Sequence, residues 1–114
     1  MKLRSIAVLI AIVGLPALAI AAEMHMSGAD SEVGKAFMTA NDKMMKAMAI
    51  APTADADRNF VVMMIPHHEG AIEMAKIELQ FGKDPQLRQL AEAVIVAQEK
   101  EIAEMKVWLA GHVH

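Results

Sequence analysis

Residues 60–85 read FVVMMIPHHEGAIEMAKIELQFGKDP, and this stretch decides the fold. Apolar residues recur in it at helical spacing up to Gly82, a residue type that commonly follows the last turn of a helix. Asp84 is a good N-cap, and Pro85 suits the first position of a helix. The stretch therefore predicts a helix over 57–81, a short turn and a second helix that returns antiparallel to the first.

The same signals extend the helical pattern in both directions along the chain. A first helix is expected over 32–50, capped by Ser31 and stopped before Pro52, which disfavours a helical residue in front of it. Asp55 or Asp57 is the expected N-cap of the helix over 57–81, and the last helix is expected to run over 85–109. No alternating β-type pattern occurs. The expected fold class is all-α, a small bundle of three main helices that contains an antiparallel hairpin.

The N-terminus has the pattern of a secretory signal peptide. Lys2 and Arg4 precede an apolar core over 6–18, and Ala19-Ile20-Ala21 is a small-x-small cleavage site. A membrane anchor is the alternative, but the apolar run is short and later apolar stretches are interrupted by charges. We therefore expect a periplasmic or secreted protein with no stable membrane insertion after cleavage. The expected division is a signal peptide at 1–21, a flexible segment at 22–31, the helical bundle at 32–110 and a flexible tail at 111–114.

Composition restricts the possible partners. The chain has a formal net charge of −3, and removal of Lys2 and Arg4 makes it more acidic, which disfavours nucleic acid as a partner. It holds eleven Met and no Cys, so methionine is its soft metal ligand and a disulfide framework is excluded. Its core is thin for a domain of this size, so a bound metal or a second subunit that completes a four-helix bundle is expected to add stability.

Two adjacent histidines, His67 and His68, lie among methionines in the expected helix over 57–81. Imidazole and thioether form a soft ligand set that suits Cu(I) and Ag(I). Projected at 100° per residue, His67 points at the middle of the apolar stripe, and His68 lies at its edge. The stripe consists of Phe60, Met64, His67, Ala71, Met74 and Glu78.

A hairpin that turns at 81–84 pairs residues whose numbers add to about 165. His67 then faces Gln98, and Met64 faces Glu101. Buried polar groups need partners, so this coincidence of polar residues predicts a site inside the bundle, to which methionines of the first helix contribute if that helix packs on the hairpin. The expected metal ligands are Met44, Met48, Met64, His67, His68, Met74 and Met105, with Gln98 and Glu101 as supporting groups.

Other interpretations stay open. Methionine is a common core filler, so the alternative is a helical interaction module in which the cluster of His, Gln and Glu is structural. Ile72 breaks a zinc-protease His-Glu-x-x-His pattern, and no histidine follows a glutamate by three residues, as di-iron bundles require. A copper oxidase is a weaker possibility because no substrate pocket can be identified. The sequence favours a binding protein over an enzyme, with no catalytic residues assigned.

Three segments carry a resemblance to a known family. Residues 57–60 (DRNF), 63–75 (MMIPHHEGAIEMA) and 98–109 (QEKEIAEMKVWL) resemble the domain-of-unknown-function 305 family. The resemblance implies a ferritin-like fold, and some exported members are similar to copper-binding and copper-resistance proteins. Relatives often carry Met-x-x-Met-His-x-x-Met in the first helix, where this chain has Asn41 and Met45 in place of a Met and the His. The resemblance implies copper buffering, resistance or transfer, with a copper exporter or metallochaperone as partner.

Overall fold

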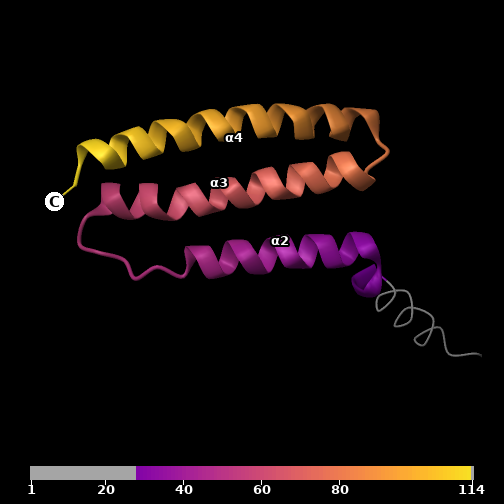
Figure 1. Cartoon of the computed structure of the whole chain (residues 1–114), viewed down its shortest axis with the longest axis horizontal. Helices are drawn as coiled ribbons and strands as arrows, with labels where there is room; N and C mark the ends of the chain where they lie inside the picture. The colour runs from indigo at the N-terminus through magenta and orange to yellow at the C-terminus, as the bar shows by residue number, and fades with distance from the viewer. Residues whose placement is uncertain (1–27, 114) are drawn as a thin grey trace, which may run out of the picture.

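The computed structural model describes residues 28–113, and its regular elements there are three long helices (Figure 1). They are α2 (Glu32–Met48), α3 (Ala56–Phe81) and α4 (Pro85–Gly111). The expected all-α bundle with an antiparallel hairpin is confirmed, because α3 and α4 run side by side in opposite directions. The expected signal peptide, 1–21, lies outside the described residues.

Side-chain caps fix the start of each helix. Ser31, Asp55 and Asp84 are the N-caps of α2, α3 and α4, and each side chain accepts a hydrogen bond from the backbone N–H three residues later. These bonds satisfy N–H groups that the first turn of a helix leaves without a partner. Of the two candidates for the α3 cap, Asp55 is the one used, and Pro85 occupies the first position of α4, as expected.

The two connections are held by side chains that bond to backbone atoms. The Asn59 side chain donates to the Thr53 carbonyl at 2.8 Å and accepts from the Thr53 N–H at 2.8 Å, which ties the α2–α3 link to the first turn of α3. Arg88 donates to the carbonyls of Leu79 at 2.8 Å and Gly82 at 3.0 Å. Arg88 thereby joins the start of α4 to the end of α3.

The three helices form a single layer with α3 in the middle. Helices α2 and α4 each pack on α3, and none of their Cα atoms approach each other within 8 Å. Figure 1 shows this order across the layer. A middle helix has to bury two opposite sides, so α3 turns Pro66 and Gly70 toward α2 and His68 toward α4.

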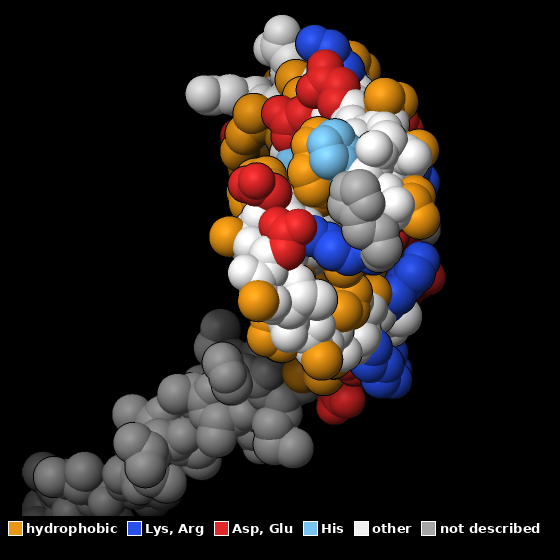
Figure 2. All heavy atoms as spheres, turned by 90° about the vertical axis from the view of Figure 1, so that its left-hand side faces the viewer, with side chains coloured by type: hydrophobic (Ala, Val, Ile, Leu, Met, Phe, Trp, Pro, Cys, Tyr) orange, Lys and Arg blue, Asp and Glu red, His pale blue; other side chains and the backbone are white. Residues whose placement is uncertain are grey.

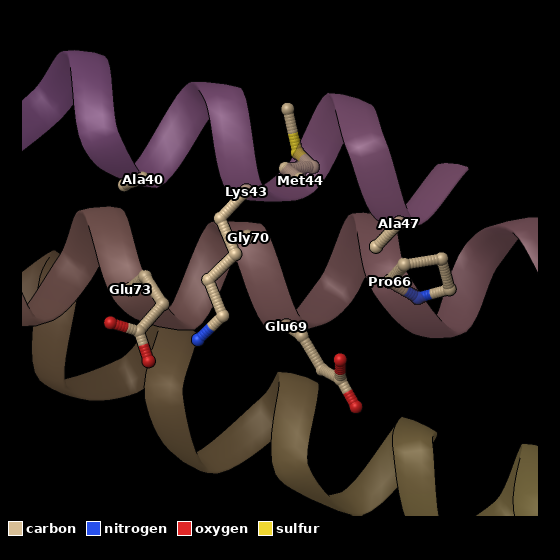
Figure 3. A pocket seen from close by; sticks show the side chains of 8 residues that line it. All are labelled: Ala40, Lys43, Met44, Ala47, Pro66, Glu69, Gly70 and Glu73. Carbon is tan, nitrogen blue, oxygen red and sulfur yellow. The ribbon is translucent and has the colours of Figure 1, made fainter. Parts of the chain in front are cut away.

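The closest approach between α2 and α3 occurs at Gly70. Met44 of α2 lies over this glycine, and a Cβ atom added to Gly70 would stand 2.7 Å from Met44 Cγ and 3.0 Å from Met44 Cβ. Figure 3 shows Met44 above Gly70, with Lys43 reaching past them toward the side on which Glu69 and Glu73 lie. Glycine is needed here for close packing, because any larger residue would push α2 away from α3.

We predict that Gly70→Ala lowers the free energy of unfolding by about 1–2 kcal/mol. Overpacking costs about 1–3 kcal/mol, and the better helix propensity of alanine returns up to about 1 kcal/mol. Urea denaturation followed by circular dichroism measures the change. In a Met44→Ala background the same substitution should cost less or stabilise, because the Met44 Sδ and Cγ atoms are gone and only the Cβ contact at 3.0 Å remains.

Gly111→Ala is the matched control, since an added Cβ there meets nothing within 4 Å. Equal effects of the two glycine substitutions would contradict the packing argument.

Candidate metal centre

The two adjacent histidines occupy different environments. Consecutive helical residues point about 100° apart, so one of them can face α4 while the other does not. The His68 side chain is only 13% exposed and lies against α4. His67 is exposed. The expectation that His67 is the inward residue is therefore wrong, because α3 gives its two packing sides to α2 and α4 and leaves the stripe between them uncovered.

The contact between α3 and α4 at this level joins His68 Nε2 to Glu101 Oε2 at 2.5 Å. The expected pairs, His67 with Gln98 and Met64 with Glu101, assumed residue numbers that add to about 165. Long side chains on a helix lean toward its N-terminus, so in an antiparallel pair their tips meet at a higher sum than the backbone register predicts. Glu101 is consequently reached by His68, one helical turn beyond Met64.

Two buried polar atoms near this pair have no hydrogen-bond partner. They are His68 Nδ1 and Gln98 Oε1. If His68 Nε2 carries the proton that it donates to the Glu101 carboxylate, then Nδ1 is a bare lone pair. Both orphaned atoms are then acceptors, and neither can supply a proton to the other. Buried acceptors without a donor are uncommon, and a bound cation satisfies them as well as a donor does.

His68 also borders an open cavity of about 520 Å³ between α3 and α4. Met105 contributes a thioether to this cavity, which Phe60 also lines. The full lining is Phe60, Val61, His68, Glu101, Glu104, Met105 and Trp108.

The methionines expected to converge on the histidines are spread over the layer. Met44 is engaged with Gly70 on the α2 side of α3, away from His68. Met48, Met64 and Met74 are half-buried. The structure therefore groups His68, Glu101 and Met105 and does not bring Met44 to them.

Within residues 28–113, no three side chains among His, Asp and Glu gather closely enough to hold a metal ion. A metal bound at His68 would accordingly take at least one ligand of another kind, and the Met105 thioether lines the same cavity.

Sequence reasoning missed three residues of the cavity, Val61, Glu104 and Trp108. Trp108 follows Glu101 by seven residues and so shares its side of α4, a spacing from which its position could have been found. Helix α4 runs to Gly111, two residues beyond its expected end at 109. The His112 ring stacks on Trp108 with centroids 4.1 Å apart, and its Nδ1 bonds to the Trp108 carbonyl at 2.7 Å.

The chain belongs to the family described as Domain of unknown function (DUF305), whose model matches residues 9–109. The resemblance noted in the sequence is thus confirmed at the level of the family. The chain is also similar to the uncharacterized protein L153 of Acanthamoeba polyphaga mimivirus, with 45% identity over 49 residues. That match covers 43% of this chain and 32% of the viral protein, so it spans about a third of that relative's length.

We predict that Glu101→Ala changes the tautomer of His68. The carboxylate favours the proton on Nε2, so its removal should give a mixture of Nε2–H and Nδ1–H forms, read from ¹⁵N chemical shifts of the imidazole. The free energy of unfolding should fall by about 1 kcal/mol or less, because the Glu101 side chain is 53% exposed.

Glu104 lines the same cavity, and its carboxylate pairs with Lys100 at 3.5 Å. Glu104→Ala removes this carboxylate. It should leave the His68 tautomer unchanged. An identical change in the His68 ¹⁵N chemical shifts of both variants would show that the overall negative charge of the cavity, rather than the contact with Glu101, sets the tautomer.

Proposed function

We propose that this member of the DUF305 family binds a soft cation at His68. Cu(I) is the preferred ion, and Ag(I) is the alternative. The observation that carries the proposal is that His68 Nδ1 and Gln98 Oε1 are both buried without a hydrogen-bond partner. A cation supplies the missing partner for His68 Nδ1. The absence of cysteine and the eleven methionines of the chain agree with this choice of metal.

Each residue of the proposed site has a distinct role. His68 would hold the ion through Nδ1, and Met105 would add a thioether from α4. Glu101 stands on the far nitrogen of the imidazole, where a carboxylate fixes the ring and increases its basicity. Gln98 supports the site from one turn away. The bound ion would be cargo for buffering, resistance or transfer, and we assign no catalytic step.

The proposed context is an exported protein. The signal-peptide pattern at 1–21 supports a periplasmic or secreted location, where a copper exporter or metallochaperone would deliver or receive the ion. None of the helices within residues 28–113 combines the length and the apolar character that a membrane crossing requires.

The second candidate function is a helical interaction module in which His68 and Glu101 only join α3 to α4. Large exposed hydrophobic side chains, among them Phe60 and Leu90, favour it. The two functions differ in what His68→Gln should do. Glutamine keeps a hydrogen-bond donor for Glu101 but removes the imidazole, so it preserves a structural role and abolishes a soft-metal site.

We predict that the protein competes with a chromophoric chelator for Cu(I), and that His68→Gln and Met105→Leu each weaken binding by at least about tenfold, which corresponds to roughly 1.4 kcal/mol. X-ray absorption of the Cu(I) form should show both nitrogen and sulfur neighbours.

His112→Gln and Met45→Leu change the same residue types outside the site and should leave the affinity unaltered. Unchanged affinity in His68→Gln would disprove the site, and the interaction module would then be the better description.

We also predict that the chain found outside the cytoplasm begins at Ala22. The small-x-small rule places the cut after Ala21, and N-terminal sequencing of the exported protein reads the start directly. A chain recovered only in the cytoplasm and beginning at residue 1 would contradict export.

A further inference from the structure

One broad side of the helical layer leaves large hydrophobic side chains exposed, with the Glu101 and Glu104 carboxylates at its α4 edge. On α3, this side of the layer consists of the stripe around His67, which lies between the side packed on α2 and the side packed on α4. The adjoining flanks of α2 and α4 extend the surface. We call this surface the apolar face and define it by Phe37, Met48, Phe60, His67, Met74 and Leu90. Phe60 is 60% exposed and Leu90 is 57% exposed, although both are large hydrophobic residues.

The contacts between helices show that these residues share one side. Lys43 and Thr39 of α2 lie with Glu73 of α3 around a shallow groove, so the opposite flank of α2, which carries Phe37, lies with His67. Glu101 and Trp108 of α4 line a cavity with Phe60. Leu90 precedes Trp108 by eighteen residues, which is about five full helical turns, so it lies on the same flank.

The other broad side of the layer is charged. It carries Lys35, Lys43, Glu69, Glu73 and Lys76. In the end-on view of Figure 2, most of the Lys and Arg side chains in sight lie toward the right and most of the acidic ones toward the left, and hydrophobic side chains appear on both flanks. A surface that binds anionic lipid needs basic residues around its apolar patch, and here they are on the wrong side.

The uncovered face leaves the core incomplete. Among the described residues, seven hydrophobic residues are buried to 9% exposure or less, and no large side chain falls below 2%. A stable domain encloses its core between at least two layers of secondary structure, and this chain supplies one layer over 28–113. Apolar patches of this extent on a soluble protein mark a contact surface.

We propose that the apolar face is covered by the apolar face of a second copy of this chain, which gives a two-layer homodimer of six helices. A helix of the length of α3 spans about 39 Å, and three helices side by side span about 28 Å. The face therefore offers on the order of 1,000 Å² per copy, and a stable dimer needs roughly 800 Å². If residues 1–21 are removed as proposed above, the six residues at 22–27 reach only about 20 Å and cannot cover it.

Two-fold symmetry places His67 at the centre of this interface. α3 is the middle helix, and its midpoint lies near His68, so His67 is the apolar-face residue closest to the centre of the layer. In an isologous contact with the axis there, His67 meets His67 of the second copy. One imidazole then donates to the other, which satisfies a polar group that would otherwise be buried alone.

Sedimentation equilibrium of the chain, in the form that the cell produces and with a Cu(I) chelator present, tests the proposal independently of metal binding. We expect twice the chain mass at micromolar concentration. Leu90→Glu should weaken the dimer at least tenfold, because it buries a charge in the interface. Val96→Glu makes the same change on α4 at a valine that is 71% exposed and points away from α3, and it should have no effect.

A second measurement does not depend on the folding of Leu90→Glu. The chain has no cysteine, so His67→Cys carries a single thiol and should form a disulfide-linked dimer on mild oxidation, whereas Lys76→Cys should not. A monomer at all concentrations would overturn the proposal and indicate that residues before 28 or another partner cover the face. A dimer cross-linked through Lys76→Cys, or dissociated by Val96→Glu alone, would also overturn it.

Discussion

The structure depends on the requirement that α3 pack on two neighbours at once. Two residues along a helix correspond to a rotation of about 200°, so Gly70 and His68 point in nearly opposite directions. Gly70 lets α2 approach through Met44, and His68 reaches α4 through Glu101. These contacts fix both outer helices relative to the middle one and keep the outer helices apart.

This arrangement decides what each histidine can do. Because His68 faces α4, it is largely buried, oriented by a carboxylate and left with an unpartnered Nδ1. His67 is held at the edge of the same helix and opens onto the apolar face. One pair of neighbouring residues thus supplies a candidate ligand for a soft cation inside the layer and a polar group at the centre of a surface between copies.

The two proposals rest on different gaps in the same molecule. At His68 the missing element is a hydrogen-bond or cation partner, since two buried polar atoms lack one. On the apolar face the gap is hydrophobic, because a single layer of helices leaves Phe60 and Leu90 in water. Either could be true without the other, since His68 and Glu101 already lie within one chain.

The sequence by itself determined the elements. Ser31, Asp84, Pro85 and Gly82 act through local backbone hydrogen bonds and dihedral preferences, so the positions of helix ends and the antiparallel hairpin followed from residues a few positions apart. It also placed His68, Gln98, Glu101 and Met105 among the candidate site residues, although it paired Gln98 with His67 and Glu101 with Met64.

Only the tertiary structure decided which histidine faces inward and which side of α3 is buried. A helical projection shows that an apolar stripe exists, but it cannot show how many neighbours a helix has. With one neighbour, α3 would have buried the stripe around His67. With two, it buries the sides that flank this stripe, and the lean of side chains toward each helix N-terminus moves the polar contact from Met64 to His68. These outcomes depend on packing between segments distant in the chain, which local pattern does not encode.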